Sequence, residues 1–376
     1  MRGAILGLAI VGAVLATAPA GLSARRAQGP PTVPAPKTAD SRPWPSAEEL
    51  ASRKREADRL PLFRGDEPMP FTLSADFRAV DRDRDPNSTK TFPATIDFAR
   101  DDGRAVSMPL RIRTRGHSRR NNATCTFAPM RLEFDKTLTR GLAFEGHGAI
   151  KLGTHCRDGS EEVILREYAI YRMFNLLTPR SFRARLARAT YVDNVRKQTI
   201  ATEYGLFIED DADVARRLEG RTTTLEKVIF ARVDPDALNL MTLFEYMIGN
   251  TDMSIYSQHN VRLVQTPAGR RYPVPYDFDY SGLVDAAYAV PGKDLGIQSV
   301  RERLFRGPCR TTAEWAPYVE KLQAAKPEFL AIYDAVPLSD SYRRQAKSYL
   351  EEFYRTIASP ARFKQAVIDK CQRIGM

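Results

Sequence analysis

The sequence has few of the features that assign a chain to a common class at first sight. Its 376 residues include only four cysteines, four histidines and two tryptophans. No two cysteines have the close C-x-x-C spacing of many zinc sites, and no internal repeat is present. No basic segment carries the interleaved aromatic residues of a nucleic-acid-binding motif, so we predict no nucleic-acid partner. Hydrophobic and charged fractions of 43% and 27% are those of a globular protein.

The N-terminal apolar run is too short to span a bilayer. It extends from Ala4 to about Ala16, whereas a membrane-spanning helix needs roughly 20 apolar residues. Arg2 precedes the run and small residues follow it, which is typical of a secretory signal peptide over residues 1–24. No cysteine follows the run, so we expect no lipid attachment. These features predict a secreted or periplasmic protein with no transmembrane segment in the mature chain.

The segment after the signal peptide lacks the residues needed for a core. Residues 25–46 are rich in proline, alanine and serine. Such a composition cannot bury enough apolar surface to offset chain entropy, and it predicts an extended, disordered linker. We therefore expect the folded domain to comprise residues 47–376.

Cysteine is scarce but even in number. The four residues are Cys125, Cys156, Cys309 and Cys371. In an exported protein they indicate two disulfides, for which three pairings exist. We favour Cys125–Cys156 and Cys309–Cys371, because each pair would link positions within one half of the chain. The alternative is a metal site around His155 and Cys156, with His117 and Cys125.

Positive charge exceeds negative charge, and the net charge is +11. Runs at 111–115 and 180–188 contribute much of it. A basic surface can meet anionic lipid or a phosphate-rich substrate. A solvated basic face is the simpler interpretation of the helical and C-terminal charges.

Hydrophobic periodicity divides the chain into a strand-rich half and a helix-rich half. Period-two alternation predicts strands at 71–80, 92–98, 106–115, 130–134, 149–152, 186–192 and 198–208. Helical spacing predicts helices at 46–58, 161–176 and 236–248, and over most of 311–373. We expect Ser46 to cap the first of these helices. Two further strands, 260–265 and 271–276, form a predicted hairpin. This order indicates a small lobe over about 66–208 and a large lobe over about 211–376.

Acid and amide groups follow the 236–248 helix in an informative order. Asp252 lies in a loop after the helix, where a general base is often presented. Asn260 begins the first hairpin strand and Asp277 follows the second, so both side chains should lie at one end of the ribbon. Asp279 points to the same side as Asp277 in extended backbone. Oxygen ligands of this kind suit Mg²⁺ held against phosphate oxygens.

These motifs resemble the spore-coat CotH kinase family. The residues that carry the resemblance are Gly249-Asn250-Thr251-Asp252, His259-Asn260 and Pro273-Val274-Pro275-Tyr276-Asp277-Phe278-Asp279. Looser matches upstream are Arg113 to Arg119, Met130 to Phe134, Leu165-Arg166-Glu167 and Glu203 to Glu209. The resemblance covers roughly residues 105–285. It implies an α+β, two-lobed protein-kinase-like fold, with an antiparallel sheet and one helix in the small lobe and a mainly helical large lobe containing the metal-site hairpin.

The resemblance also implies an activity and its residues. The family transfers the γ-phosphate of ATP to Ser or Thr of a protein with Mg²⁺ or Mn²⁺. Asp252 would be the catalytic aspartate that accepts the proton of the acceptor hydroxyl, Asn260 and Asp277 would hold the metal, and Asp279 would support or share it. Other residues would bind the nucleotide: Lys151 paired with Glu167 as the first choice of phosphate-binding cation, Arg131 as the second, Arg115 in place of a glycine loop, and Glu209 at the hinge.

The sequence departs from the family pattern at several positions. Pro129 and Met130 stand where the family usually has two lysines, His117 replaces an asparagine, and no Gly-x-Gly-x-x-Gly loop is present. Extracytoplasmic compartments also hold little ATP. Two alternatives therefore stay open: a pseudoenzyme that binds a partner or cell-envelope component, and a metal-dependent transferase that uses another donor.

Overall fold

The computed structural model describes residues 42–116, 118–157 and 159–373. The predicted signal peptide and linker residues 25–41 lie outside these ranges. At the end of the predicted linker, Arg221 donates hydrogen bonds to the carbonyl oxygens of Arg42 and Pro43, and its guanidinium lies 4.3 Å from the centre of the Trp44 ring. Helix α1 then begins, capped by the Ser46 side chain, which accepts a hydrogen bond from Glu49 N at 3.1 Å. The cap agrees with the sequence prediction.

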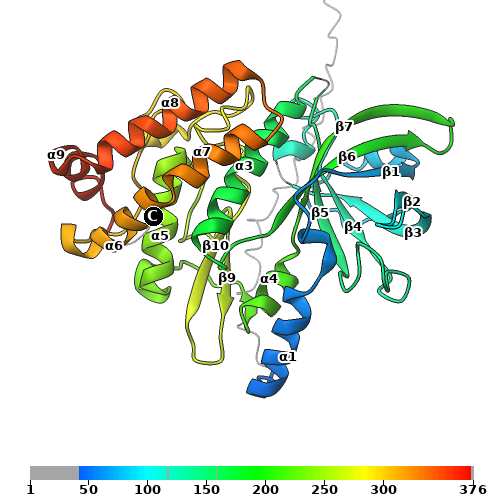
Figure 1. Cartoon of the computed structure of the whole chain (residues 1–376), viewed down its shortest axis with the longest axis horizontal. Coiled ribbons are helices and arrows are strands. Elements are labelled where there is room, and N and C mark those ends of the chain that lie inside the picture. Colours follow the sequence, from blue (N-terminus) through cyan, green and yellow to red (C-terminus); the bar gives the residue numbers. More distant parts are fainter. Residues whose placement is uncertain (1–41, 117, 158, 374–376) are drawn as a thin grey trace, which may run out of the picture. The chain divides into compact units, whose positions relative to one another are not determined.

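Seven strands close into a barrel, drawn in blue to green in Figure 1. They are β1 (Met69–Ala75), β2 (Phe92–Ala99), β3 (Ala105–Thr114), β4 (Met130–Glu133), β5 (Ala149–Gly153), β6 (Ala184–Asp193) and β7 (Gln198–Ile208). Their order around the barrel is β1-β2-β3-β4-β5-β7-β6. Alternate residues of β1, such as Phe71 and Leu73, face the interior, where they pack with Ile96, Ile112 and Phe207. Alternation in the sequence therefore has its expected cause, one buried face per strand.

One strand pair decides how the barrel closes. β1 pairs in parallel with β6, with Leu73 opposite Tyr191, whereas the other six pairs are antiparallel. Between β5 and β6 the chain forms helix α3 (Glu161–Leu177), which is buried along much of its length. The remaining short elements near the barrel are α1 (Ala47–Asp58), η1 (Pro61–Phe63), α2 (Phe77–Arg82) and η2 (Ser118–Arg120).

The second part of the chain is mainly helical. Its elements are α4 (Asp211–Arg217), β8 (Arg221–Thr223), η3 (Phe230–Arg232), α5 (Pro235–Ile248), β9 (Val261–Gln265), β10 (Arg271–Pro275), η4 (Lys293–Leu295), α6 (Thr312–Ala324), α7 (Lys326–Ala335), α8 (Asp340–Ile357), α9 (Pro360–Phe363) and η5 (Lys364–Ile368). Strands β8, β9 and β10 form a separate antiparallel sheet. Helix α5 lies at the centre of the helical core, with residues such as Met241 and Phe244 fully buried. The C-terminal helices, orange and red in Figure 1, pack around it.

The predicted two-lobed kinase-like fold is wrong. Instead of a small antiparallel sheet lobe with one helix, the structure has a closed, mixed barrel of seven strands. Helix α3, assigned from the sequence to the small lobe, shares one hydrophobic core with the C-terminal helices, where its Phe174 packs on Phe244 of α5. The prediction failed because alternation in the sequence shows that a strand has a buried face, but does not show which distant strand it pairs with.

The predicted disulfide pairing is confirmed. Cys125 is bonded to Cys156 and Cys309 to Cys371, and the chain has no free cysteine. The alternative metal site is therefore wrong, because thiolates bound in disulfides cannot act as ligands. His117, which that alternative included, lies outside the described residues. Two disulfides fit an extracellular protein.

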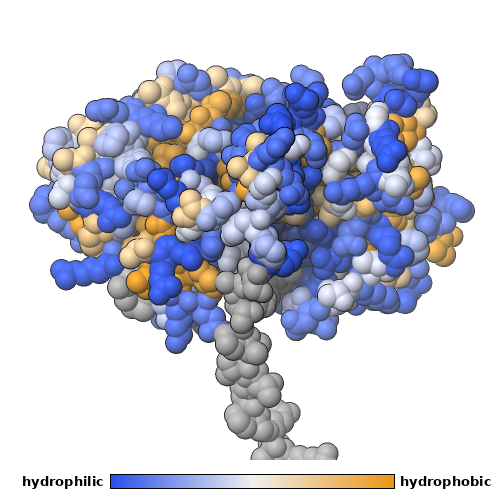
Figure 2. Space-filling view, turned by 90° about the horizontal axis from the view of Figure 1, so that it is seen from below, coloured by the Kyte–Doolittle hydropathy of each residue, from blue (hydrophilic) through white to orange (hydrophobic). Residues whose placement is uncertain are grey.

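The described part of the chain includes no helix that is long and apolar enough to cross a membrane. Hydrophilic residues cover most of the face shown in Figure 2, and hydrophobic residues form small separate groups there.

Candidate functional site

The loop after α5 holds Asp252 in a defined position. Helix α5 ends at Gly249, whose left-handed conformation (φ 69°) turns the chain sharply. The Asn250 side-chain oxygen then accepts a hydrogen bond from Asp252 N at 3.0 Å. Arg306 donates to the carbonyl oxygens on either side, those of Thr251 at 2.6 Å and Met253 at 2.9 Å. The Asp252 side chain is 39% exposed and therefore accessible to a substrate.

Asn260 and Asp277 lie together at one end of the β9–β10 hairpin, as the sequence predicted. Tyr276 N donates to Asn260 O at 3.0 Å, which extends the pairing of the two strands to this end. Asn260 Nδ2 donates to both the carbonyl oxygen and Oδ2 of Asp252, at 2.8 and 3.1 Å. The Asp277 backbone N–H is held by the hydroxyl of Tyr171 on α3, at 3.0 Å. The hairpin end, the α5 loop and α3 thus meet at one point.

Both hairpin residues have unusual backbone conformations. The φ angles of Asn260 and Asp277 are 53° and 63°, in the left-handed region that non-glycine residues rarely adopt. Conformations of this kind cost on the order of 1–3 kcal/mol and are concentrated at functional sites. Asn and Asp tolerate this region better than other non-glycine residues, so the residue types at both positions match their backbone conformations.

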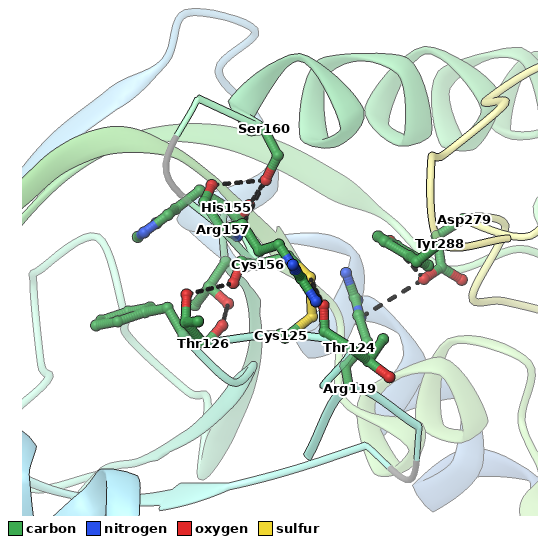
Figure 3. Close-up of a disulfide and its surroundings, with 12 residues drawn as sticks. Arg119, Thr124, Cys125, Thr126, His155, Cys156, Arg157, Ser160, Asp279 and Tyr288 are labelled. Carbon is green, nitrogen blue, oxygen red and sulfur yellow. Dashed lines mark hydrogen bonds and ion pairs between the residues drawn. A yellow bond between two sulfur atoms is a disulfide. The ribbon is translucent and has the colours of Figure 1, made fainter. Parts of the chain in front are cut away.

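Three carboxylates and one arginine form the centre of the site. Glu167 on α3, Asp277 and Asp279 are the carboxylates, which we call the acid cluster. Arg119 lies between the two aspartates, with Nη2 3.7 Å from Asp277 Oδ1 and Nε 3.6 Å from Asp279 Oδ2. Tyr288 donates its hydroxyl proton to Asp279 Oδ2 at 2.9 Å. Figure 3 shows Arg119 and Tyr288 directed at Asp279 from different segments.

The acid cluster is largely closed to solvent. Glu167 is fully buried, the Asp279 side chain is 4% exposed and that of Asp277 is 31% exposed. Neither carboxylate oxygen of Glu167 has a hydrogen-bond partner within the described residues, and neither has Arg119 Nη1. Buried polar atoms without partners are rare and each calls for an explanation. In this site the described residues leave the hydrogen-bonding capacity of Glu167 and of Arg119 Nη1 unsatisfied.

Burial perturbs the ionisation of these acids. Burial raises the pKa of Glu167 to about 8, with Arg119 opposing the shift and Asp279 adding to it. Burial and the neighbouring charge of Asp277 raise the pKa of Asp279 to about 6, against the attraction of Arg119. At neutral pH the raised pKa keeps Glu167 mostly protonated, so the two aspartates and Arg119 leave a local charge of about −1. A bound cation would offset that negative charge and favour ionisation of Glu167.

Lys151 is not paired with Glu167 as the sequence predicted, and its phosphate-binding role stays a prediction. It lies on β5 and donates a hydrogen bond to Asp211, and its ammonium is 4.2 Å from the centre of the Phe182 ring. No hydrogen bond or ion pair joins it to Glu167 in the described structure. Arg262 binds the other oxygen of Asp211 at 2.7 Å, and burial lowers the pKa of Lys151. The structure therefore places Arg119, rather than Lys151, beside the acid of α3.

Two other predicted nucleotide contacts are engaged in ion pairs. Arg131 pairs with Asp210, at the start of α4. Glu209 is fully buried and accepts hydrogen bonds from Arg183 at 2.8 Å and from Arg217 at 2.7 Å. Burial opposes ionisation of Glu209, but Arg217 and Arg183 hold its pKa below the ordinary value. Their nucleotide-binding roles stay predictions, and the visible role of Glu209 is to join its two arginines.

Arg115, another predicted phosphate contact, has a side chain that forms no ion pair with the described residues. Its backbone N–H donates to Pro129 O at 2.8 Å, but its side chain makes no hydrogen bond or ion pair with any described residue. Its charge is nevertheless close enough to lower the pKa of Glu167 and of Lys151. A half-buried guanidinium without a protein partner beside an acid cluster is suited to bind an anion.

Sequence reasoning missed several residues of the site. Arg119 is separated by more than a hundred residues from the aspartates it contacts, and Tyr288 follows the motif in an irregular segment. His259 Nε2 lies 3.3 Å from Asp252 Oδ1, and this contact raises the pKa of His259. His259 carried a signal because it directly precedes Asn260 in the motif, and Arg119 carried one because it ends the upstream segment of the resemblance.

The oxygen atoms of the site could supply some, but not all, of the ligands of a hard cation such as Mg²⁺. No group of three or more His, Cys, Asp and Glu side chains among the described residues is arranged to hold a metal ion. Asp277 and Asp279 supply two carboxylates, however, and the amide of Asn260, oriented by its two bonds to Asp252, leaves its oxygen unbonded. Mg²⁺ characteristically takes only one or two carboxylates and completes its shell with water and substrate phosphates. This donor set suits such a shared site rather than a protein-only one.

Comparison with known proteins does not assign the chain to a family. No protein-family model matches it, and no curated protein is significantly similar to it. The resemblance to the CotH family therefore stays a prediction, and the geometry of the site carries the functional argument.

Proposed function

We propose that the protein catalyses metal-dependent transfer of a phosphoryl group to a hydroxyl group of a protein, with ATP as the donor. The observation that carries the proposal is the convergence of Asp252, Asn260, Asp277 and Asp279 beside a buried site whose own charges do not balance. The proposal rests on these side chains and not on a kinase fold, which the chain does not have.

Each residue has a role that follows from its contacts. Asn260 and Asp277 would hold Mg²⁺ or Mn²⁺, with Asp279 behind them as a shared or supporting ligand. The bound ion would neutralise negative charge on the donor phosphates. Asp252 is exposed and held by Asn260 and His259, so it can accept the proton of an approaching hydroxyl. Arg115 is the cation that remains available for the phosphate oxygens.

The proposed setting is extracytoplasmic. Two disulfides and the N-terminal sequence pattern support export by a signal peptide over residues 1–24. The acceptor would then be a secreted or cell-envelope protein.

The test is thermal stability of the purified protein with ATP and Mn²⁺, each alone and together. One-site binding at 100 times the dissociation constant stabilises a protein by about 2.7 kcal/mol, which a shift in melting temperature reveals. We expect a shift with both ligands present, its loss in Asp277→Asn, and its retention in Asp101→Asn, which alters an exposed aspartate in the β2–β3 turn. No shift with any nucleotide and metal would refute the proposal.

A second candidate function is favoured by the position of Arg119. Its guanidinium lies against both proposed metal ligands, as expected of a site that has exchanged its metal for a fixed cation. Such a protein would bind a partner at this surface without transferring phosphate. Nucleotide-dependent stabilisation without phosphate transfer to any protein would favour this alternative.

A further inference from the structure

Arg119 is the one buried cation of the site that the proposed chemistry does not use. Its side chain is 5% exposed and enters the acid cluster from the segment between β3 and β4. Figure 3 shows it directed at Asp279, close to the Cys125–Cys156 disulfide. We call residues 118–127 the Arg119 loop.

Arg119 lies near the two aspartates as a counter-ion but does not form close, hydrogen-bonded ion pairs with them. Both distances to the aspartates exceed 3.5 Å, beyond the range of a good hydrogen bond, and Nη1 has no partner among the described residues. Electrostatic attraction therefore holds the guanidinium near Asp277 and Asp279. The same two carboxylates are the ones proposed to bind a divalent ion.

The Arg119 loop is secured at its far end. Cys125 is bonded to Cys156, which follows β5, and Phe127 N donates to Cys156 O at 3.0 Å. Arg157 donates to Thr124 O at 2.8 Å. Phe127 also stacks on the ring of His155, with centres 4.7 Å apart. The loop thus has a covalent link and several weaker ones to the segment that leads into α3.

Two cations cannot share these carboxylates without cost. Two unit charges about 4 Å apart interact by about 4 kcal/mol at an effective dielectric constant of 20, and a divalent ion doubles the repulsion. A metal ion at Asp277 and Asp279 must therefore either displace the guanidinium or bind more weakly because of it. The attachment of the loop decides how readily the displacement occurs.

We propose that Arg119 is a resident counter-ion that competes with a divalent cation for Asp277 and Asp279, and that the Cys125–Cys156 disulfide keeps it in place. This regulation rests on the proposed metal-binding function of the site. It makes the loop between β3 and β4 a control element of metal affinity.

The test is Mn²⁺ binding to the purified protein, measured by the electron paramagnetic resonance signal of free Mn²⁺. Arg119→Met removes the charge, Arg119→Lys retains it, and Arg119→Gln replaces the Met variant if that does not fold. Cys125→Ser/Cys156→Ser frees the loop, and Cys309→Ser/Cys371→Ser is the matched control. Circular dichroism verifies that each variant is folded.

We expect Mn²⁺ to bind at least about tenfold more tightly to Arg119→Met than to the wild type. Arg119→Lys should lie near the wild type, the Cys125/Cys156 variant should lie between wild type and Arg119→Met, and the control should match the wild type. Wild-type binding with no gain in the folded Met or Gln variant would overturn the competition while leaving the proposed function intact. No Mn²⁺ binding by any variant would overturn the competition, whereas the proposed function is overturned only by the absence of a melting shift with ATP and Mn²⁺ together.

Discussion

Because Glu245 is buried, we expect the free energy of unfolding to fall measurably as the pH rises. It lies on α5, is 2% exposed, and belongs to the helix that leads to the Asp252 loop. Burial raises the pKa of Glu245 from 4.5 to about 8, with the Asn250 amide opposing the shift and the charge of Asp252 adding to it. The folded protein therefore keeps this proton at a pH where the unfolded chain has lost it.

The magnitude follows from linkage. A carboxyl with a raised folded-state pKa favours the folded state fully below about pH 4.5, and this advantage is lost as the pH rises to about 8. Each pH unit between these values costs about 1.4 kcal/mol, so about 3 kcal/mol is lost between pH 4.5 and pH 7. Glu245→Gln mimics the protonated carboxyl and should remove this loss.

The assay is urea unfolding at pH 5, 6, 7 and 8, with both disulfides intact. The stability difference between Glu245→Gln and the wild type should become more favourable to the variant by up to about 1.4 kcal/mol for each pH unit. Glu320→Gln, on the exposed side of α6, is the control and should follow the wild type. A difference between Glu245→Gln and the wild type that does not change with pH would refute a neutral buried Glu245.

Two further predictions concern the support of the site. Arg217→Met leaves the buried Glu209 with one arginine fewer and should lower the free energy of unfolding, measured by urea titration, by about 3 kcal/mol. Arg53→Met removes an exposed ion pair and should lower it by less than about 1 kcal/mol. Equal losses in the two variants would contradict a buried network. Gly249→Ala places a Cβ 2.0 Å from a tyrosine hydroxyl at a φ of 69°. It should lower the free energy of unfolding by more than the roughly 1 kcal/mol expected of Gly269→Ala, a position with a similar φ and no atom near the added Cβ. A smaller loss at Gly249 would show that the end of α5 adjusts easily to the added methyl group.

Local features of the fold were within reach of the sequence. Most strands and the main helices occur where hydrophobic periodicity predicted them, because most of these segments have one buried face; α5 and β5, which are buried on all sides, are the exceptions. The Ser46 cap and both disulfides are confirmed. Asn260 and Asp277 lie together because a hairpin brings its two ends to the same place, and this proximity depends only on the lengths of two adjacent strands.

The long-range features of the fold could not be predicted from the sequence. The parallel pairing of β1 with β6 closes the barrel and overturns the kinase-like fold, but it joins segments separated by more than a hundred residues. The partner of Glu167 was likewise assigned to Lys151 by position in the sequence, whereas Lys151 is bound to Asp211. Neither choice leaves a local pattern, because each depends on how distant elements pack.

The sequence by itself determined the local elements and the group of acid and amide side chains at the hairpin, since periodicity and strand length act over short distances. Only the tertiary structure decided the closure of the barrel, the burial of Glu167 and the arrival of Arg119 between two aspartates. The physical reason is that charge and burial depend on all the segments that surround a side chain. Here those segments come from four separate parts of the chain: the loop between β3 and β4, α3, the hairpin end and the segment around Tyr288.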